Sequence, residues 1–155
     1  AAKQAAKQIE PAESFEAALL ARVNADRVAY GLRALAFDPE LVATARARAA
    51  AQRPGEALTH AASAAPGAPA GPSFAFQQLL KEAGVRYAVA GENLARPRVA
   101  PAADPVEAAT AAHRALMASE THRRNILDPA FDRLAVGMTR GADGQIVFAQ
   151  LFRGA

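Results

Sequence analysis

Residues 134–152 have the sequence LAVGMTRGADGQIVFAQLF. The segments 134–140 and 145–152 are two runs of the β type, and the GADG segment between them contains residues that favour tight turns. We therefore predict a β-hairpin near the C-terminus. A further extended segment is predicted at residues 85–95, where apolar side chains alternate with others.

Helices are predicted ahead of the hairpin, because apolar residues recur there at helical spacing. The first helix is expected to end at Gly31 and the third at Gly84, since glycine often follows the last helical residue. A short helical turn is predicted at residues 122–127, and loops at 61–72 and 96–103. The residues predicted to cap the four longer helices are Ser14, Asp38, Ser73 and Asp104.

The order of these elements predicts the fold class. Helices come first and strands mostly late, which is typical of an α+β domain with helices packed on a small antiparallel sheet. A length of 155 residues suits a single domain. We expect an N-terminal extension at residues 1–13 and one domain at 14–155. The phenylalanines are expected to carry much of its core: Phe15, Phe37, Phe74, Phe76, Phe131, Phe148 and Phe152.

Composition excludes several classes of site. The chain has no cysteine, which rules out disulfides, thiolate zinc sites and cysteine nucleophiles. No apolar run approaches the ~20 residues of a membrane-spanning helix, so no transmembrane segment is expected. The net charge is +3, and the arginines occur in pairs such as Arg46 and Arg48 rather than in blocks. We interpret these pairs as solvated helix faces and expect no nucleic-acid binding.

Candidate chemistry rests on the three histidines of the chain. His113 lies on an apolar helix face, which favours a hydrogen-bonded core histidine. Two imidazoles and a carboxylate, from His60, His122 and Glu92, can form an open zinc site if they converge. Their spacing alone does not show convergence, and scattered surface or capping roles remain the alternative.

The neighbours of these residues have roles of their own to weigh. Asn93 is either a scaffold residue at the turn or a ligand contact. Ser119 and His122 are close enough along a helical turn to touch, but a nucleophile–base pair also needs an orienting group and an oxyanion hole. Arg123 flanks the site and is a candidate for holding an anionic headgroup. Gly91 is expected to permit close approach of the backbone.

Several motifs occur in a fixed order along the chain, and together they resemble a bacterial domain of the CAP superfamily. This superfamily takes in cysteine-rich secretory proteins, antigen 5 and plant pathogenesis-related proteins, and its bacterial branch is also called SCP-like extracellular. The resemblance covers residues 15–152, nearly the whole chain. The matching segments are VNADR at 23–27, GLRAL at 31–35, DPEL at 38–41, ARA at 45–47, His60, GENL at 91–94, SETHRRNIL at 119–127, VG at 136–137 and FAQLF at 148–152.

The resemblance implies an α-β-α sandwich, usually exported, with a central cleft. In the family this cleft carries two histidines and two acidic residues that can bind a divalent metal. His60, Glu92 and His122 match three of them, whereas the second acid falls at Ser119 and a family tryptophan falls at Leu116. Metal binding is therefore expected to be weaker, or to use water in the vacated position.

Three functions follow as hypotheses. The first is an extracellular or periplasmic binding module, monomeric and with its signal peptide absent from the chain. Its cleft of His60, Glu92, Asn93, Ser119 and His122, with Arg123, would hold a small ligand such as a lipid-like molecule, and zinc or another divalent metal would modulate binding. The second is a metal-assisted hydrolase with Glu92 as general base or third ligand. The third is a protein-interaction domain whose histidine cleft is vestigial.

Overall fold

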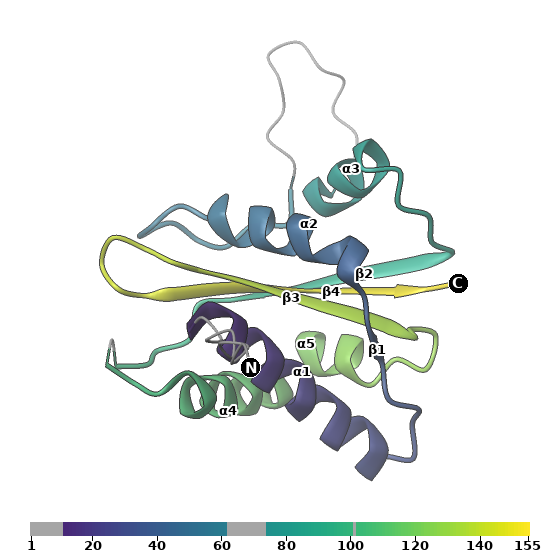
Figure 1. Cartoon of the computed structure of the whole chain (residues 1–155), viewed down its shortest axis with the longest axis horizontal. Helices are drawn as coiled ribbons and strands as arrows, with labels where there is room; N and C mark the ends of the chain where they lie inside the picture. The colour runs from purple at the N-terminus through teal and green to yellow at the C-terminus, as the bar shows by residue number, and fades with distance from the viewer. Residues whose placement is uncertain (1–10, 62–73, 101) are drawn as a thin grey trace, which may run out of the picture.

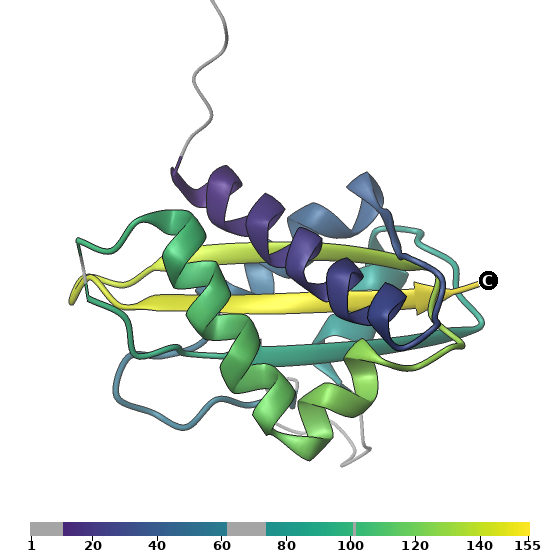
Figure 2. The ribbon, with the colours of Figure 1, turned by 90° about the horizontal axis from the view of Figure 1, so that it is seen from below.

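The computed structural model describes residues 11–61, 74–100 and 102–155. Within these ranges the chain forms three layers, with the sheet between two groups of helices (Figure 1). Helices α2 (Pro39–Ala50) and α3 (Ala75–Glu82) lie on one face of the sheet. The opposite face is covered by α1 (Pro11–Ala29), α4 (Pro105–Ala118) and α5 (Glu120–Ile126), as Figure 2 shows from below. The predicted α-β-α sandwich is confirmed.

The sheet has four strands in the order β1-β3-β4-β2 among the residues described. The predicted hairpin is present, because β3 and β4 pair antiparallel, and β2 pairs antiparallel with β4. The two-residue strand β1 pairs parallel with β3, so a short parallel edge is added to the antiparallel sheet that we predicted. The strands are β1 (Ala36–Phe37), β2 (Val89–Ala95), β3 (Arg133–Arg140) and β4 (Ile146–Gly154).

Local signals placed most helix ends correctly. Asp38 and Asp104 cap α2 and α4, because each carboxylate accepts backbone N–H bonds from the first turn. The prediction for Ser14 was wrong, because α1 begins at Pro11 and Ser14 lies inside its first turn. Ser73 lies outside the described residues. In the extended segment predicted at 85–95, only Val89–Ala95 pairs in the sheet. None of the described helices is both long and apolar enough to span a bilayer.

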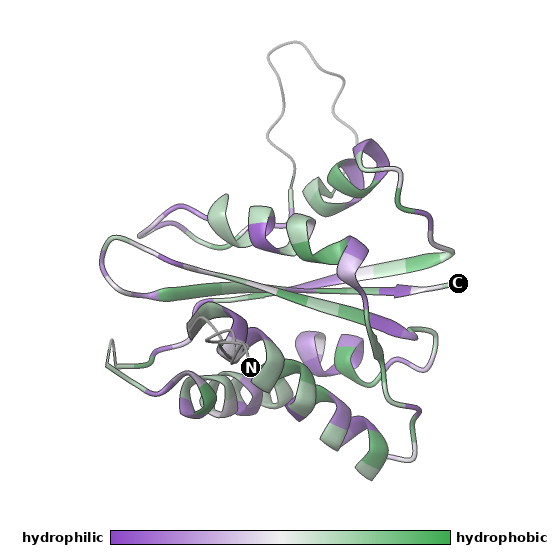
Figure 3. Ribbon diagram, viewed as in Figure 1, coloured by the Kyte–Doolittle hydropathy of each residue, from purple (hydrophilic) through white to green (hydrophobic). Residues whose placement is uncertain are grey.

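Apolar residues fill the space on both faces of the sheet. One cluster lies beneath α1 and α4 and includes Phe15 and Phe148, and a smaller one beneath α2 and α3 includes Leu41 and Phe76. Figure 3 shows hydrophobic residues along the strands. Hydrophilic residues lie at the start of β3 and at the end of β4, near the C-terminus. The expectation for the phenylalanines was wrong at two positions, because Phe37 is 56% exposed and Phe74 is 47% exposed.

Helix α2 lies directly on the sheet at Gly137 of β3. A Cβ atom at Gly137 would lie 2.1 Å from the backbone nitrogen of Arg46 and 2.2 Å from the carbonyl carbon of Ala45. These are backbone atoms, so no side-chain rotation could make room for a methyl group. The absence of a side chain at Gly137 therefore sets the depth at which α2 sits on the sheet.

Candidate functional site

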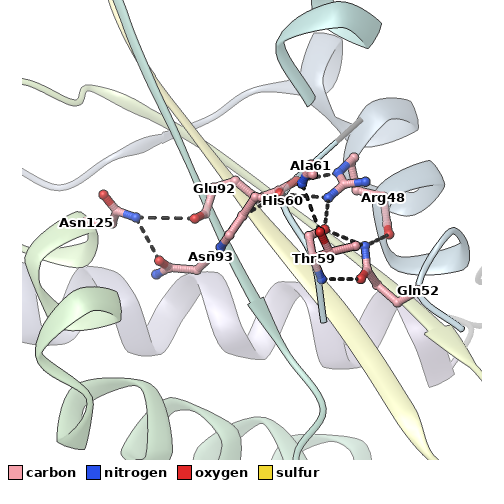
Figure 4. Close-up of polar contacts among 8 residues, drawn as sticks. All are labelled: Arg48, Gln52, Thr59, His60, Ala61, Glu92, Asn93 and Asn125. Carbon is pink, nitrogen blue, oxygen red and sulfur yellow. Dashed lines mark hydrogen bonds and ion pairs between the residues drawn. The ribbon is translucent and has the colours of Figure 1, made fainter. Parts of the chain in front are cut away.

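Glu92 of β2 is the centre of a buried polar cluster. Its side chain is 0% exposed. The Nε atom of Arg48 donates to Oε2 at 2.8 Å and its Nη2 atom donates to Oε1 at 3.0 Å (Figure 4). The Nδ1 atom of His60 also lies 2.8 Å from Oε1. The fold thus brings His60 and Glu92 together, with Arg48 as a third member that we had not selected from the sequence.

Arg48 is buried and only 3% exposed, so our interpretation of it as part of a solvated helix face was wrong. Its Nη2 atom also donates to the carbonyl oxygen of Thr59 at 2.7 Å. Gln52, one turn further along the chain, accepts from the backbone N–H of Thr59 at 2.9 Å. Both side chains therefore hold the segment that carries His60, as Figure 4 shows.

The sequence did contain a signal for the burial of Arg48. Leu41 and Ala45 lie on the buried side of α2, and Arg48 follows Leu41 by two helical turns. An arginine on such an apolar face needs an acidic partner, because a buried unpaired charge is costly. The periodicity could therefore have identified Arg48, but not its partner Glu92.

The ring of His60 is half-exposed, with 46% of its side chain accessible. An ionised carboxylate can only accept a hydrogen bond, so Nδ1 is the donor toward Glu92 and Nε2 of the neutral ring carries a lone pair. The ring of Phe74 meets that of His60 edge-on, with centroids 6.4 Å apart, and stacks on the buried ring of Phe76. The backbone N–H of Ala75 donates to the carbonyl oxygen of His60 at 2.9 Å, which fixes the two aromatic residues beside each other.

His122 belongs to a second network, on α5. Its Nδ1 atom lies 2.8 Å from Oγ of Ser119, the contact that the sequence allowed. Burial lowers the pKa of His122, a hydrogen bond with the backbone of Leu94 opposes this, and the electrostatic effect of nearby His60 lowers the pKa further. The two imidazoles are thus electrostatically coupled, although no hydrogen bond in the described part of the chain joins His122 to His60 or Glu92.

Asn93 serves as scaffold in this structure. It is 1% exposed, and its Nδ2 atom donates to the carbonyl oxygen of His122 at 3.2 Å and to Oε1 of Gln150 at 3.0 Å. Its Oδ1 atom accepts from Nδ2 of Asn125 at 2.8 Å (Figure 4). These bonds tie α5 to β2 and β4. Gly91 lets side chains pack closely on the backbone of β2, because a Cβ there would lie 2.9 Å from Cζ of Phe131 and 3.3 Å from Oδ1 of Asn125.

Two other predicted residues lie away from His60 and Glu92. Arg123 is half-buried, and its Nη1 atom donates to the carbonyl oxygen of Met117 at 3.1 Å, so it closes the end of α4. His113 is 5% exposed, and its Nε2 atom lies 2.6 Å from Oδ2 of Asp26 on α1. The prediction of a hydrogen-bonded core histidine is confirmed.

The residues present do not fit a three-ligand metal site. A metal ion needs free lone pairs, but the carboxylate of Glu92 already accepts three hydrogen bonds and lies beside a guanidinium cation. The imidazole of His122 is engaged elsewhere, because Nδ1 contacts Ser119 and the ring also hydrogen-bonds with the backbone of Leu94. The described ranges contain no group of three or more His, Asp or Glu side chains that could hold a metal ion. The side chain of Glu92 is fully buried, so its carboxylate does not face solvent in this structure.

A family model described as "CAP: Cysteine-rich secretory protein family" matches residues 20–152. The chain belongs to this family. The resemblance stated from the sequence is thereby confirmed. A curated relative from Bacillus subtilis, "Uncharacterized protein YkwD", is 29% identical over 125 residues, which cover 80% of this chain and 42% of the relative. The chain thus spans less than half the length of that protein.

Solved structures share the CAP fold at lower identity. An extracellular protein containing an SCP domain from Bacillus anthracis is 21% identical, with a TM-score of 0.68 over 91% of this chain and 40% of that one. A cysteine-rich secretory protein from Staphylococcus aureus is 16% identical, with a TM-score of 0.66 over 99% of this chain and 42% of that one. An outer surface protein from Borrelia burgdorferi, also 16% identical, gives 0.69 over 94% of this chain and 96% of its own.

Proposed function

We propose that this CAP-family domain is an exported binding module for a small, lipid-like ligand. The observation that carries the proposal is the pairing of a half-exposed imidazole with a half-exposed aromatic ring, His60 and Phe74, held side by side. A ligand with one polar and one apolar part matches such a surface, because ligand sites combine apolar walls with a few placed polar groups.

The polar contact comes from the outward edge of His60. Glu92 fixes the ring through Nδ1, which leaves Nε2 to accept a hydrogen bond from a hydroxyl or a protonated carboxyl group. Because Arg48 already neutralises Glu92, the cluster carries no net charge with His60 neutral. A neutral, hydroxylated head therefore suits this surface better than an ionic one.

The apolar contact comes from Phe74. Phe74 is 47% exposed beside the half-exposed ring of His60, so an apolar part of a ligand can pack on it while a polar part meets the imidazole. Phe74 stacks on Phe76, which is 4% exposed, so its ring is supported from within the core and loses little freedom when a ligand packs on it.

Export of the domain and action as a monomer complete the proposal. The Bacillus anthracis and Borrelia burgdorferi neighbours are described as extracellular and outer-surface proteins, which supports an extracellular or periplasmic location.

Equilibrium titration with dehydroergosterol and with a dansyl-labelled fatty acid tests the proposal. We expect saturable binding of at least one probe, weakened tenfold or more by Phe74→Ala and by His60→Ala. Phe37→Ala is the matched control, because Phe37 is also about half-exposed, at 56% against 47% for Phe74, but lies in β1 at the opposite edge of the sheet from β2. Absence of saturable binding for both probes, or equal weakening by Phe37→Ala, would contradict it.

A further inference from the structure

The Arg48 guanidinium lies where a metal ion would have to bind Glu92. It contacts both carboxylate oxygens, at 2.8 and 3.0 Å, and the two side chains are 4% and 0% exposed. A bidentate guanidinium–carboxylate pair of this kind is strong and directional. An added divalent cation would have to displace it or sit beside a like charge in a region that water reaches poorly.

Arg48 also connects the groups that a metal ion at this point would connect. Its Nη2 atom holds the carbonyl oxygen of Thr59, the residue before His60, while Nε and Nη2 hold Glu92. Glu92 in turn orients the His60 ring through Nδ1. One cation thus connects the acidic residue and the segment that carries the histidine.

The second arginine pair on α2 shows that this arrangement is not a general property of the helix. Arg46 also contacts both oxygens of a glutamate, Glu16, but its side chain is 46% exposed. No histidine shares the carboxylate of Glu16, which instead accepts the backbone N–H of Met138. Of these two pairs on α2, the Arg48 pair is the one that combines burial, an imidazole and a fixed cation.

We infer that Arg48 is a permanent internal cation in place of a divalent metal, so that His60 is oriented without metal. Arginine stays protonated at any physiological pH, so this cation cannot be removed by chelators or by competition among metals. Arg48 is a positioning residue that acts through Glu92. Removing its charge while keeping its bulk should leave Glu92 and His60 as a carboxylate–imidazole pair able to bind zinc. The inference rests on the buried ion pair and not on the identity of any ligand.

Zinc titration by calorimetry of the wild type, Arg48→Met and Arg48→Lys tests this inference. Methionine and lysine have similar lengths, but only lysine keeps a cation near Glu92. We expect Arg48→Met to bind zinc at least tenfold more tightly than the wild type, and Arg48→Lys to behave like the wild type. The gain should disappear in Arg48→Met combined with His60→Ala, and Arg46→Met should show none.

Two results would overturn the inference. One is zinc binding by the wild type that is lost in His60→Ala and in Glu92→Gln. The other is a folded Arg48→Met protein without any gain in zinc affinity. If Arg48→Met does not fold, Arg48→Gln and refolding with zinc present replace it.

The tautomer of His60 provides a measurement on the wild type alone. Long-range ¹H–¹⁵N correlation spectra distinguish the two neutral imidazole forms. We expect the Nδ1–H form, unchanged by a chelator. The Nε2–H form, or a spectrum that changes when EDTA is added, would count against a metal-free arrangement whether or not the lipid probes bind.

Discussion

Arg46 and Arg48 lie on the same helix, and each contacts both oxygens of a glutamate from another element, but their surroundings differ. The Arg48–Glu92 pair is closed off from solvent, with side chains 4% and 0% exposed, and it borders His60. The Arg46–Glu16 pair is open on its arginine side, where 46% of the side chain is exposed, and it joins α2 to α1. The same two residue types thus form one internal pair and one peripheral pair.

Burial, rather than contact geometry, distinguishes the internal pair from the peripheral pair. The hydrogen bond to Glu16 is the largest influence on Arg46 and raises its pKa, as expected for a cation held by a carboxylate near solvent. Water can hydrate Arg46 if Glu16 is lost, because 46% of the arginine side chain is exposed. Water cannot hydrate Arg48 or Glu92 in the same way, because both side chains are buried, so each of them depends on its partner.

The largest difference is expected when each glutamate is neutralised. Glu92→Gln leaves Arg48 buried without a counter-charge, and we expect it to lower the free energy of unfolding by about 3–5 kcal/mol. Glu16→Gln should cost roughly 1 kcal/mol, because Arg46 can be hydrated. Urea denaturation of both variants measures this. Equal losses would show that the internal pair is not special.

A smaller difference is expected when each arginine is replaced by lysine, which keeps the charge but cannot form the two-bond contact. Arg48→Lys should cost about 1.5–3 kcal/mol, the range for one hydrogen bond to a charged group. Arg46→Lys should cost about 0.5 kcal/mol or less. Thermal and urea denaturation under the same conditions provide the test, and a larger loss for Arg46→Lys would reverse the comparison.

Salt should affect the two pairs unequally. Raising the ionic strength from about 0.1 M to about 1 M shortens the screening length from about 10 Å to about 3 Å, which weakens exposed pairs more than buried ones. The cost of Glu16→Gln should therefore shrink by a few tenths of a kcal/mol at high salt, whereas that of Glu92→Gln should stay constant. Urea titrations at both salt concentrations decide this. A salt-sensitive Glu92→Gln would indicate that solvent reaches the internal pair.

The smallest effect is expected from acidification, through His122. Its pKa in the folded protein lies below the ordinary value of 6.5, mainly because of burial. The unfolded chain then binds more protons in the window just below pH 6.5, so stability should fall slightly as the pH drops from neutral through that window. Denaturation curves at several pH values should show this dependence of stability on pH in Glu16→Gln, which keeps His122. The dependence should be weaker in His122→Gln. An unchanged slope in His122→Gln would assign the effect to another group.

Much of the fold could be predicted because its signals are local. The caps at Asp38 and Asp104 and the turn at residues 141–144 act within a few residues of each other, so the sequence contains them complete. The exposure of Phe37 and Phe74 could not be predicted, because it depends on which elements pack nearby and not on the residue type.

The site was harder to predict, because its contacts join distant segments. His60 and Glu92 are separated by 32 positions, and only the family resemblance suggested that they meet. Arg48 was missed because arginine pairs usually lie on solvated helix faces, although its helical phase placed it on the buried side of α2. The electrostatic effect of His60 on His122 depends on the packing of α5 against β2, which the family resemblance suggested but no local sequence signal did.

Gly137 links the two arginine pairs although it has no functional group. Because α2 touches the sheet there backbone to backbone, even one extra methyl would lift the helix and draw Arg46 and Arg48 away from their partners at once. A substitution at Gly137 would therefore disrupt both the histidine cluster and the contact between α2 and α1, although Gly137 belongs to neither. In a mutational scan, substitutions at Gly137 should be tolerated as poorly as those at the charged residues of the two pairs. The reason would be steric rather than electrostatic.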